Sequence, residues 1–321
     1  MKHFTRVLLI LLLLAVTAFA GDGKTAGLVF FDYSHDTADD AANGFGFHRV
    51  SYSYQRELSE GISYKFQTDI DTKSSPFNVY LKYAKVDWKS PMGKLTIGLQ
   101  SMNVSNVQEK NWGYRSIEKS AMDHNKWSSS ADMGIAYSKT LARAIYLNTM
   151  ILDGAGYKHS EDDSHKKISV QAIYGETKVG KKDVFQLGAV QTYEPYDFEV
   201  DSVTIEKKNK LVTGVFGTYA GNGIRVGAEF NILNDSRLGK TEQLISAYAN
   251  YRLTKGFEVF NRYDLLNPDT ETSDNGESLF IAGAVYSPGK GLKIIPNLHY
   301  EMYADSAVHP HTSNLAFEIK L

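Results

Sequence analysis

Residues 62–71 read Ile-Ser-Tyr-Lys-Phe-Gln-Thr-Asp-Ile-Asp, and apolar and polar side chains alternate along them. Successive side chains of an extended strand point to opposite faces, so Ile62, Tyr64 and Phe66 would share one face. Residues 224–231, IRVGAEFN, repeat the pattern. Soluble β-sandwiches and membrane β-barrels both use such strands. The alternation therefore predicts an all-β protein without deciding between these two folds.

The connections between the segments distinguish the two folds. Strands are predicted at residues 26–35, 45–58, 62–72, 77–89, 94–104, 133–140, 144–152, 167–177, 184–194, 210–220, 224–234, 242–253, 257–266, 278–287, 292–302 and 313–321. Tight turns, most of them with Gly, fall at every second connection, at residues 59–61, 91–93, 141–143, 221–223, 254–256 and 288–291. Longer polar connections mostly separate them. This pattern predicts a transmembrane antiparallel β-barrel of about 16 strands, within a range of about 14 to 18. The turns would be periplasmic, the longer loops extracellular, and both ends of the chain periplasmic.

The first twenty residues have the three parts of a secretory signal peptide. Lys2 and Arg6 supply positive charge, residues 7–16 are apolar, and Ala18 and Ala20 are small residues at a cleavage site. The apolar run is shorter than the roughly 20 residues that a membrane-spanning helix needs. We expect residues 1–20 to be removed and residues 21–321 to form the barrel.

Composition excludes several kinds of site. The chain has no Cys, so it has no disulfide, no zinc–thiolate site and no Cys nucleophile. Without Lys2 and Arg6 it has 33 basic and 37 acidic residues, a balance that does not suit nucleic-acid binding. The nine His lie in no G-x-S-x-G or H-E-x-x-H motif. We predict no enzyme activity, no metal and no cofactor.

The last segment alternates Leu315, Phe317, Ile319 and Leu321 on one face. It resembles the C-terminal strand that outer-membrane barrels present to their assembly machinery. The usual final residue of that signal is aromatic, whereas this chain has Leu321.

The longest predicted connection is residues 105–130, SNVQEKNWGYRSIEKSAMDHNKWSSS. Its large aromatic side chains, Trp112, Tyr114 and Trp127, are unfavourable in water. We expect the loop to fold into the lumen, with its aromatic side chains against the wall, rather than to lie in solvent. The predicted constriction residues are Glu109, Lys110, Arg115, Glu118 and Lys119.

Three nearby segments resemble the phosphate-selective porin O/P group of Gram-negative outer-membrane porins. They are residues 80–88, YLKYAKVDW, residues 94–100, KLTIGLQ, and residues 109–115, EKNWGYR. The resemblance implies a sixteen-stranded barrel with an inward-folded third loop, and resemblance to sixteen-stranded porins implies a homotrimer. Phosphate selectivity is not carried over, because it belongs to individual arginines and lysines that these segments do not match one by one.

The predicted inward face carries both signs of charge. Its basic residues, which would line the pore, are Arg49, Lys65, Lys82, Arg225, Arg252 and Arg262. Lys293 is on the same face, and the acidic residues are Asp69, Asp71, Glu229, Glu258, Asp264 and Glu301. Opposing charges across a lumen create a field that sorts ions by sign. The near balance favours a general or weakly selective pore over a strong anion filter.

We therefore expect a porin, a passive diffusion channel for small hydrophilic or ionic solutes, including anions such as phosphate. It would lie in the outer membrane of a Gram-negative bacterium, with outer-membrane lipid, lipopolysaccharide and the barrel assembly machinery as partners. Two alternatives remain: a non-conducting structural or adhesion barrel, and an outer-membrane barrel enzyme.

Overall fold

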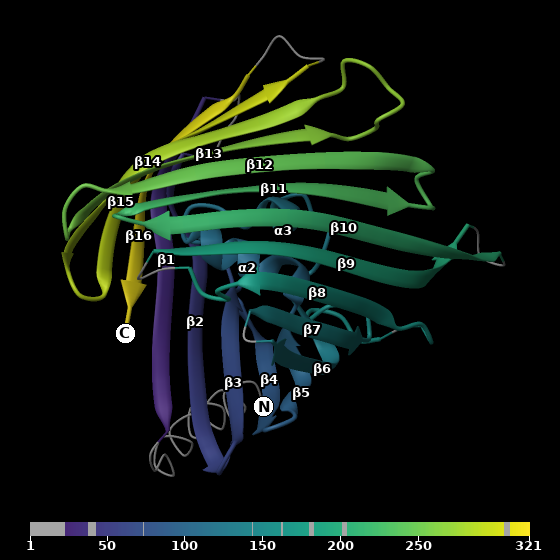
Figure 1. The fold of residues 1–321 in the computed structure, drawn as a ribbon. Helices are drawn as coiled ribbons and strands as arrows, with labels where there is room; N and C mark the ends of the chain where they lie inside the picture. Colours follow the sequence, from purple (N-terminus) through teal and green to yellow (C-terminus); the bar gives the residue numbers. More distant parts are fainter. Residues whose placement is uncertain are drawn as a thin grey trace.

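The structure, a computed structural model, describes residues 23–37, 43–72, 74–142, 144–161, 163–179, 183–200, 204–304 and 309–321. The predicted signal peptide, residues 1–20, lies outside them. The strands are β1 Lys24–Asp36, β2 Gly44–Ser59, β3 Ile62–Asp71, β4 Asn78–Ser90, β5 Gly93–Ser101, β6 Ala131–Leu141, β7 Ile145–Leu152, β8 Lys167–Gly175, β9 Val184–Glu199, β10 Ile205–Gly221, β11 Ile224–Asp235, β12 Lys240–Arg252, β13 Phe257–Asn267, β14 Glu277–Gly289, β15 Leu292–Tyr303 and β16 His311–Lys320. Each strand pairs antiparallel with its neighbours in sequence, and β1 pairs with β16 (Figure 1). The predicted sixteen-stranded antiparallel barrel is confirmed.

Turns and longer loops alternate between the two rims as expected. The turns at residues 60–61, 91–92, 222–223 and 290–291 lie on one rim. Lys24 at the start of β1 pairs with Gln55, and Ile319 near the end of β16 pairs with Leu292, so both strand ends lie on that short-turn rim. Residues 176–183 are a longer connection on the same rim.

Glycine makes the tightest of these turns possible. Gly61 has a φ of +74°, and a Cβ there would lie 2.6 Å from the backbone oxygen of Lys89 on the next hairpin. Gly223 has a φ of +79° in the turn between β10 and β11. L-residues with a Cβ rarely adopt such angles, so Gly marks where the chain reverses.

Strand bounds differ from prediction by more than two residues in two places. Residues 195–199 and 205–209, predicted to lie in a loop, instead extend β9 and β10, which project beyond the neighbouring strands (Figure 1). Pro195 pairs opposite Asn209, and the ladder continues past the amide donor that Pro lacks. The strand predicted at residues 94–104 ends at Ser101, because the chain turns into a helix two residues later.

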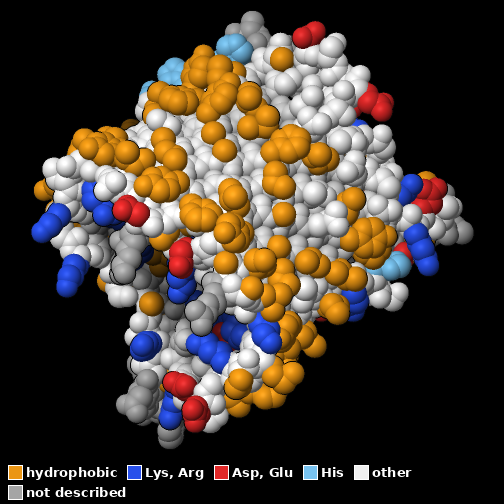
Figure 2. Space-filling view, in the orientation of Figure 1, with side chains coloured by type: hydrophobic (Ala, Val, Ile, Leu, Met, Phe, Trp, Pro, Cys, Tyr) orange, Lys and Arg blue, Asp and Glu red, His pale blue; other side chains and the backbone are white. Residues whose placement is uncertain are grey.

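The two faces of the wall differ in polarity. In β11, Ile224, Val226 and Phe230 are exposed outward, whereas Glu229 and Asn231 are buried inward. Figure 2 shows hydrophobic side chains over the outer wall and charged side chains toward its edges. Apolar-out and polar-in is the reverse of a soluble sandwich, and a barrel in lipid requires it. No helix among the described residues is long and apolar enough to cross a membrane.

Candidate functional site

The connection between β5 and β6, residues 102–130, lies inside the barrel. It contains helices α2, Asn103–Trp112, and α3, Ala121–His124, which appear behind the front wall in Figure 1. Helix α2 ends at Gly113, whose φ of 81° lets the backbone amide cap the Glu109 carbonyl. Helix α2 contacts β8, β9 and β10, and α3 contacts β12. We call residues 102–130 the inner loop.

Apolar side chains hold the inner loop to the wall in a first cluster. The loop contributes Met102, Val104, Ala121, Met122 and Trp127. The wall contributes Ala136, Met150, Leu152, Val190, Val212, Leu233 and Leu244, from strands β6 to β12. These wall residues face inward and would contact water if the loop were absent. Their burial favours docking of the loop, at about 25 cal/mol for each Å² of apolar surface removed from water.

A second cluster forms around Trp112, whose exposed fraction is 2%. Trp112 and Tyr114 pack with Phe260, Leu279, Ile281, Val285, Ile295 and Ala316, from strands β13 to β16. The Tyr114 and Phe260 rings stack with centroids 4.4 Å apart. The indole N–H of Trp112 donates to the Glu118 carbonyl at 3.1 Å, so the ring is fixed at both its apolar and its polar end.

Hydrogen bonds to charged wall residues fix the register of the loop. The Tyr114 hydroxyl donates to Glu258 Oε2 at 2.8 Å, and the Ser116 hydroxyl donates to Glu318 Oε2 at 3.0 Å. The Trp127 indole donates to Glu242 Oε2 at 3.1 Å. Lys82 donates to the Ser130 hydroxyl, and its ammonium lies 3.3 Å from the centroid of the Tyr157 ring. Charge-assisted bonds of this kind are stronger than neutral ones.

Glu118 and His124 form an ion pair within the loop, at 3.2 Å. The hydrogen bond that His124 donates to Glu118 raises the pKa of His124 above 6.5, although burial opposes it. Burial by itself would raise the pKa of Glu118, but the hydrogen bond and charge of His124 outweigh it and hold that pKa well below 4.5. Arg262 and Asp264 also face His124, with opposite effects on its pKa.

The two shifts set a pH window for this pair. The contribution of His124 is complete below pH 6.5, the ordinary pKa of a histidine side chain, and is lost as the pH rises through its raised pKa. The contribution of Glu118 is present above pH 4.5 and is lost as the pH falls through its lowered pKa. The pair therefore stabilises the docked loop most in mild acid.

We expect the wild-type protein to lose part of its free energy of unfolding between about pH 5.5 and about pH 8.5. His124→Gln should reduce this loss, whereas His159→Gln, at an exposed position in the β7–β8 loop, should leave it unchanged. Denaturant titrations of the three proteins at both pH values measure the difference. An identical pH dependence in wild type and His124→Gln would contradict the pairing.

Both apolar clusters take their wall residues from strands β6 to β16, so the inward faces of β2, β3 and the part of β4 around Lys85 lie opposite the docked loop. Lys82 of β4 instead contacts the loop at Ser130. Arg49 pairs with Asp69 at 2.9 Å, and Lys85 pairs with Asp87 at 2.8 Å. Lys65 on β3 has no ion-pair partner among the described residues. We call the space between residues 109–115 and β2–β4 the passage.

Lys110 of the inner loop faces the passage. It is exposed and, within the described part of the chain, forms no ion pair. Enclosure by the barrel lowers its pKa, and repulsion by Lys178, Lys85 and Lys65 adds to this effect against attraction by Glu109. The charges of Arg49 and Asp69 cancel, as do those of Lys85 and Asp87. Lys65 and Lys110 therefore leave the passage with an excess of positive charge.

The predicted constriction residues occupy different positions. Glu109 and Arg115 pair with each other at 2.9 Å, and both are partly exposed. Lys119 is 3.8 Å from Asp123 and is also partly exposed. Glu118 is instead turned toward His124, so it holds the loop together. Their role at a constriction remains a prediction.

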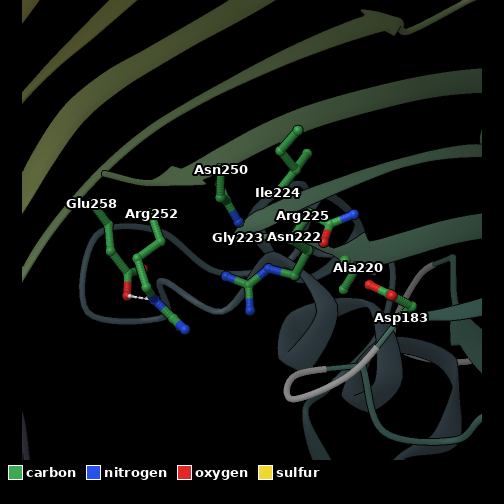
Figure 3. A pocket seen from close by; sticks show the side chains of 10 residues that line it. Asp183, Ala220, Asn222, Gly223, Ile224, Arg225, Asn250, Arg252 and Glu258 are labelled. Carbon is green, nitrogen blue, oxygen red and sulfur yellow. Dashed lines mark hydrogen bonds and ion pairs between the residues drawn. The ribbon is translucent and has the colours of Figure 1, made fainter. Parts of the chain in front are cut away.

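The predicted lining residues divide into three groups. Arg49 and Lys65 face the passage, whereas Arg225 and Arg252 line a cavity near the short-turn rim (Figure 3). Lys82 and Arg262 are on the inward face, as the alternation predicts, but the inner loop covers them, and their exposed fractions are 5% and 1%. Arg262 donates to the Lys119 carbonyl and pairs with Asp264.

Sequence reasoning missed the apolar wall that receives the loop. Ile281 and Ile295 are fully buried inward residues of β14 and β15. Their segments, SLFIAGAV at 278–285 and LKIIP at 292–296, are apolar on both faces over several residues. A strand buried on both sides shows such runs, so a break in alternation was the available signal.

Solved structures of outer-membrane proteins share this fold over nearly their whole length. An anion-selective porin from Comamonas acidovorans has a TM-score of 0.71 and 13% identity, over 94% of this chain and 99% of the porin. OprB from Pseudomonas putida has a TM-score of 0.72 and 8% identity, over 93% and 94%. OmpT of Vibrio cholerae, an outer membrane protein in a trimer form, has a TM-score of 0.67 and 12% identity, over 94% and 100%.

The chain has the porin fold. No protein-family model and no curated protein sequence matches it. Identities this low establish the fold alone, because one fold supports many functions. The porin fold does not distinguish the phosphate-selective O/P group from other barrels, so that resemblance remains a prediction.

Proposed function

We propose that this protein is a porin of a Gram-negative outer membrane, a passive channel for small hydrophilic solutes with a preference for anions. The observation that carries the proposal is the set of charged side chains on residues 109–115 and on the inward faces of β2–β4, among which Lys65 and Lys110 form no ion pair within the described residues. Solutes would cross by electrodiffusion, because positive charge at a narrow point lowers the energy of an anion there. Phosphate is one such anion.

The outward apolar wall supports outer-membrane lipid and lipopolysaccharide as surroundings. The trimer form of the Vibrio cholerae protein supports a homotrimer. Delivery by the barrel assembly machinery and removal of residues 1–20 belong to the same proposal. Absence of enzyme activity stays a prediction; among the described residues no group of three or more His, Asp or Glu could hold a metal ion.

A non-conducting barrel is the second candidate, and the two apolar clusters around the inner loop favour it, since they fill part of the lumen. Reconstitution of the pure, folded protein in a planar bilayer separates the candidates. Stepwise conductance supports the channel, and its absence would leave the structural barrel as the better account.

Charge reversal in the passage tests the anion preference. We expect a wild-type reversal potential on the anion side in a salt gradient, and a shift toward cations in the Lys65→Glu, Lys110→Glu double variant. Lys290→Glu, which makes the same change in the exposed β14–β15 turn, should have little effect. Equal shifts in the double variant and the control would show that the passage does not set selectivity.

A further inference from the structure

A cavity of about 500 Å³ lies on the short-turn rim, next to the β10–β11 turn (Figure 3). Charged residues line it: Arg225 from β11, Arg252 from β12, Glu258 from β13 and Asp183 just before β9. This volume is in the range of small-molecule sites. Arg252 and Glu258 pair with each other, whereas Arg225 and Asp183 form no ion pair within the described residues.

Arg252 and Glu258 satisfy each other. Arg252 Nε donates to Glu258 Oε1 at 3.1 Å, and the Tyr114 hydroxyl donates to Glu258 Oε2 at 2.8 Å. Both carboxylate oxygens therefore have a donor, and the two charges cancel. This pair offers little net charge to a ligand.

Arg225 has no carboxylate partner among the described residues. Its Nη2 donates to the Trp112 carbonyl at 3.0 Å, and its Nε is buried without a partner. Asn250 donates to the same carbonyl at 3.2 Å, and its own oxygen Oδ1 is buried without a partner. Arg225 is partly exposed, it is held in place by neutral groups, and within the described residues no carboxylate pairs with it.

Asp183 has no ion-pair partner within the described ranges either. Its Oδ1 lies over Gly221, where a Cβ would come within 2.3 Å of it, so the glycine leaves space for the carboxylate. In Figure 3 the guanidinium groups of Arg225 and Arg252 lie on one side of the cavity and the Asp183 carboxylate lies on the other. The Arg225 side chain extends away from Asp183.

We propose that this cavity binds a zwitterionic solute, with Arg225 holding its carboxylate and Asp183 its ammonium group. A ligand with one charge would gain from one of these residues and be repelled by the other. A ligand with both, such as an ω-amino acid or a short peptide, satisfies each in a charge-assisted hydrogen bond. The inference deepens the proposed function, on which its biological meaning rests, by naming a solute class.

Calorimetry on the folded full-length barrel in detergent tests the site with ligands of matched size. We expect γ-aminobutyrate to bind at least about tenfold more tightly than butyrate or butylamine, because each lacks one charge-assisted bond. Glycine, γ-aminobutyrate and ε-aminohexanoate form a series that varies the separation of the two charges and should show one best length. Butyrate binding as tightly as γ-aminobutyrate would reduce the cavity to a simple anion site and overturn the proposal.

Two variants assign the roles. Arg225→Gln and Asp183→Asn should each weaken γ-aminobutyrate binding at least about tenfold, and Asp183→Asn should strengthen butyrate binding. Lys139→Gln, an exposed change on the same rim outside the cavity, should leave both affinities unchanged. Absence of binding by all ligands, or γ-aminobutyrate affinity unaffected by Asp183→Asn, would also overturn the proposal. Conductance is measured separately, so loss of this site and loss of channel activity are distinct results.

Discussion

Removing residues 109–127 is expected to raise single-channel conductance more than any other change in this protein. These residues include the three loop aromatics, Trp112, Tyr114 and Trp127, and they occupy lumen that a bare sixteen-stranded barrel would leave open. With Gln108 and Ser128 joined by a short Gly/Ser linker, the passage would widen on the side of β6 to β16. Planar-bilayer recordings of the variant and the wild type measure the change.

The control for this deletion is a shortening of residues 268–276. That connection lies on the same rim as the inner loop, and most of its residues are exposed. Its removal should leave conductance near the wild-type value. The inner loop would lose its assignment as the constriction if both deletions had the same effect, or if the longer one had none.

Replacing Arg262 by methionine is expected to lower the free energy of unfolding by about 3–5 kcal/mol. Arg262 is 1% exposed and pairs with Asp264, and it also donates to the Lys119 carbonyl of the inner loop. Its guanidinium lies 5.4 Å from the centroid of the Trp112 ring. The substitution would leave a buried carboxylate without a partner and detach one point of the loop. Denaturant unfolding in detergent measures the loss.

The double variant Arg262→Met, Asp264→Leu separates a buried pair from a pore-lining charge. Removing both charges should restore most of the lost stability, because a buried pair and an apolar pair of similar volume are often nearly equal in free energy. If Arg262 only lined the pore, Arg262→Met would shift the reversal potential and leave the free energy of unfolding unchanged.

Local sequence was sufficient to predict the structure wherever a residue's neighbours in the sequence decide its environment. The alternation in β11 and the glycine turn before it predicted strand, faces and reversal correctly. It failed at Pro195, which fell between two predicted strands, because the ladder between β9 and β10 depends on residues of both strands. It also extended β5 through Met102 and Val104, whose apolar character serves a helix packed on the wall.

The site shows the same division. Trp112, Tyr114 and Trp127 indicated a loop that must be buried somewhere, since their hydrophobic surface is a property of the residues themselves. Which charges stay free is a property of pairs. Glu118 was paired by His124, and Lys82 and Arg262 were covered, while Lys65 and Lys110 were left open to the passage.

The sequence alone therefore determined the barrel, a strand number of about 16, the polarity of its two faces and the connection that folds inward. These follow from periods of two residues and from turn chemistry, which act over short stretches of chain. Only the tertiary structure decided which wall receives the inner loop and which charges remain unpaired. Closing the barrel brings Trp112 to Phe260, Arg225 to the Trp112 carbonyl and Ser116 to Glu318. Such partners are more than a hundred residues apart, and no local pattern records them.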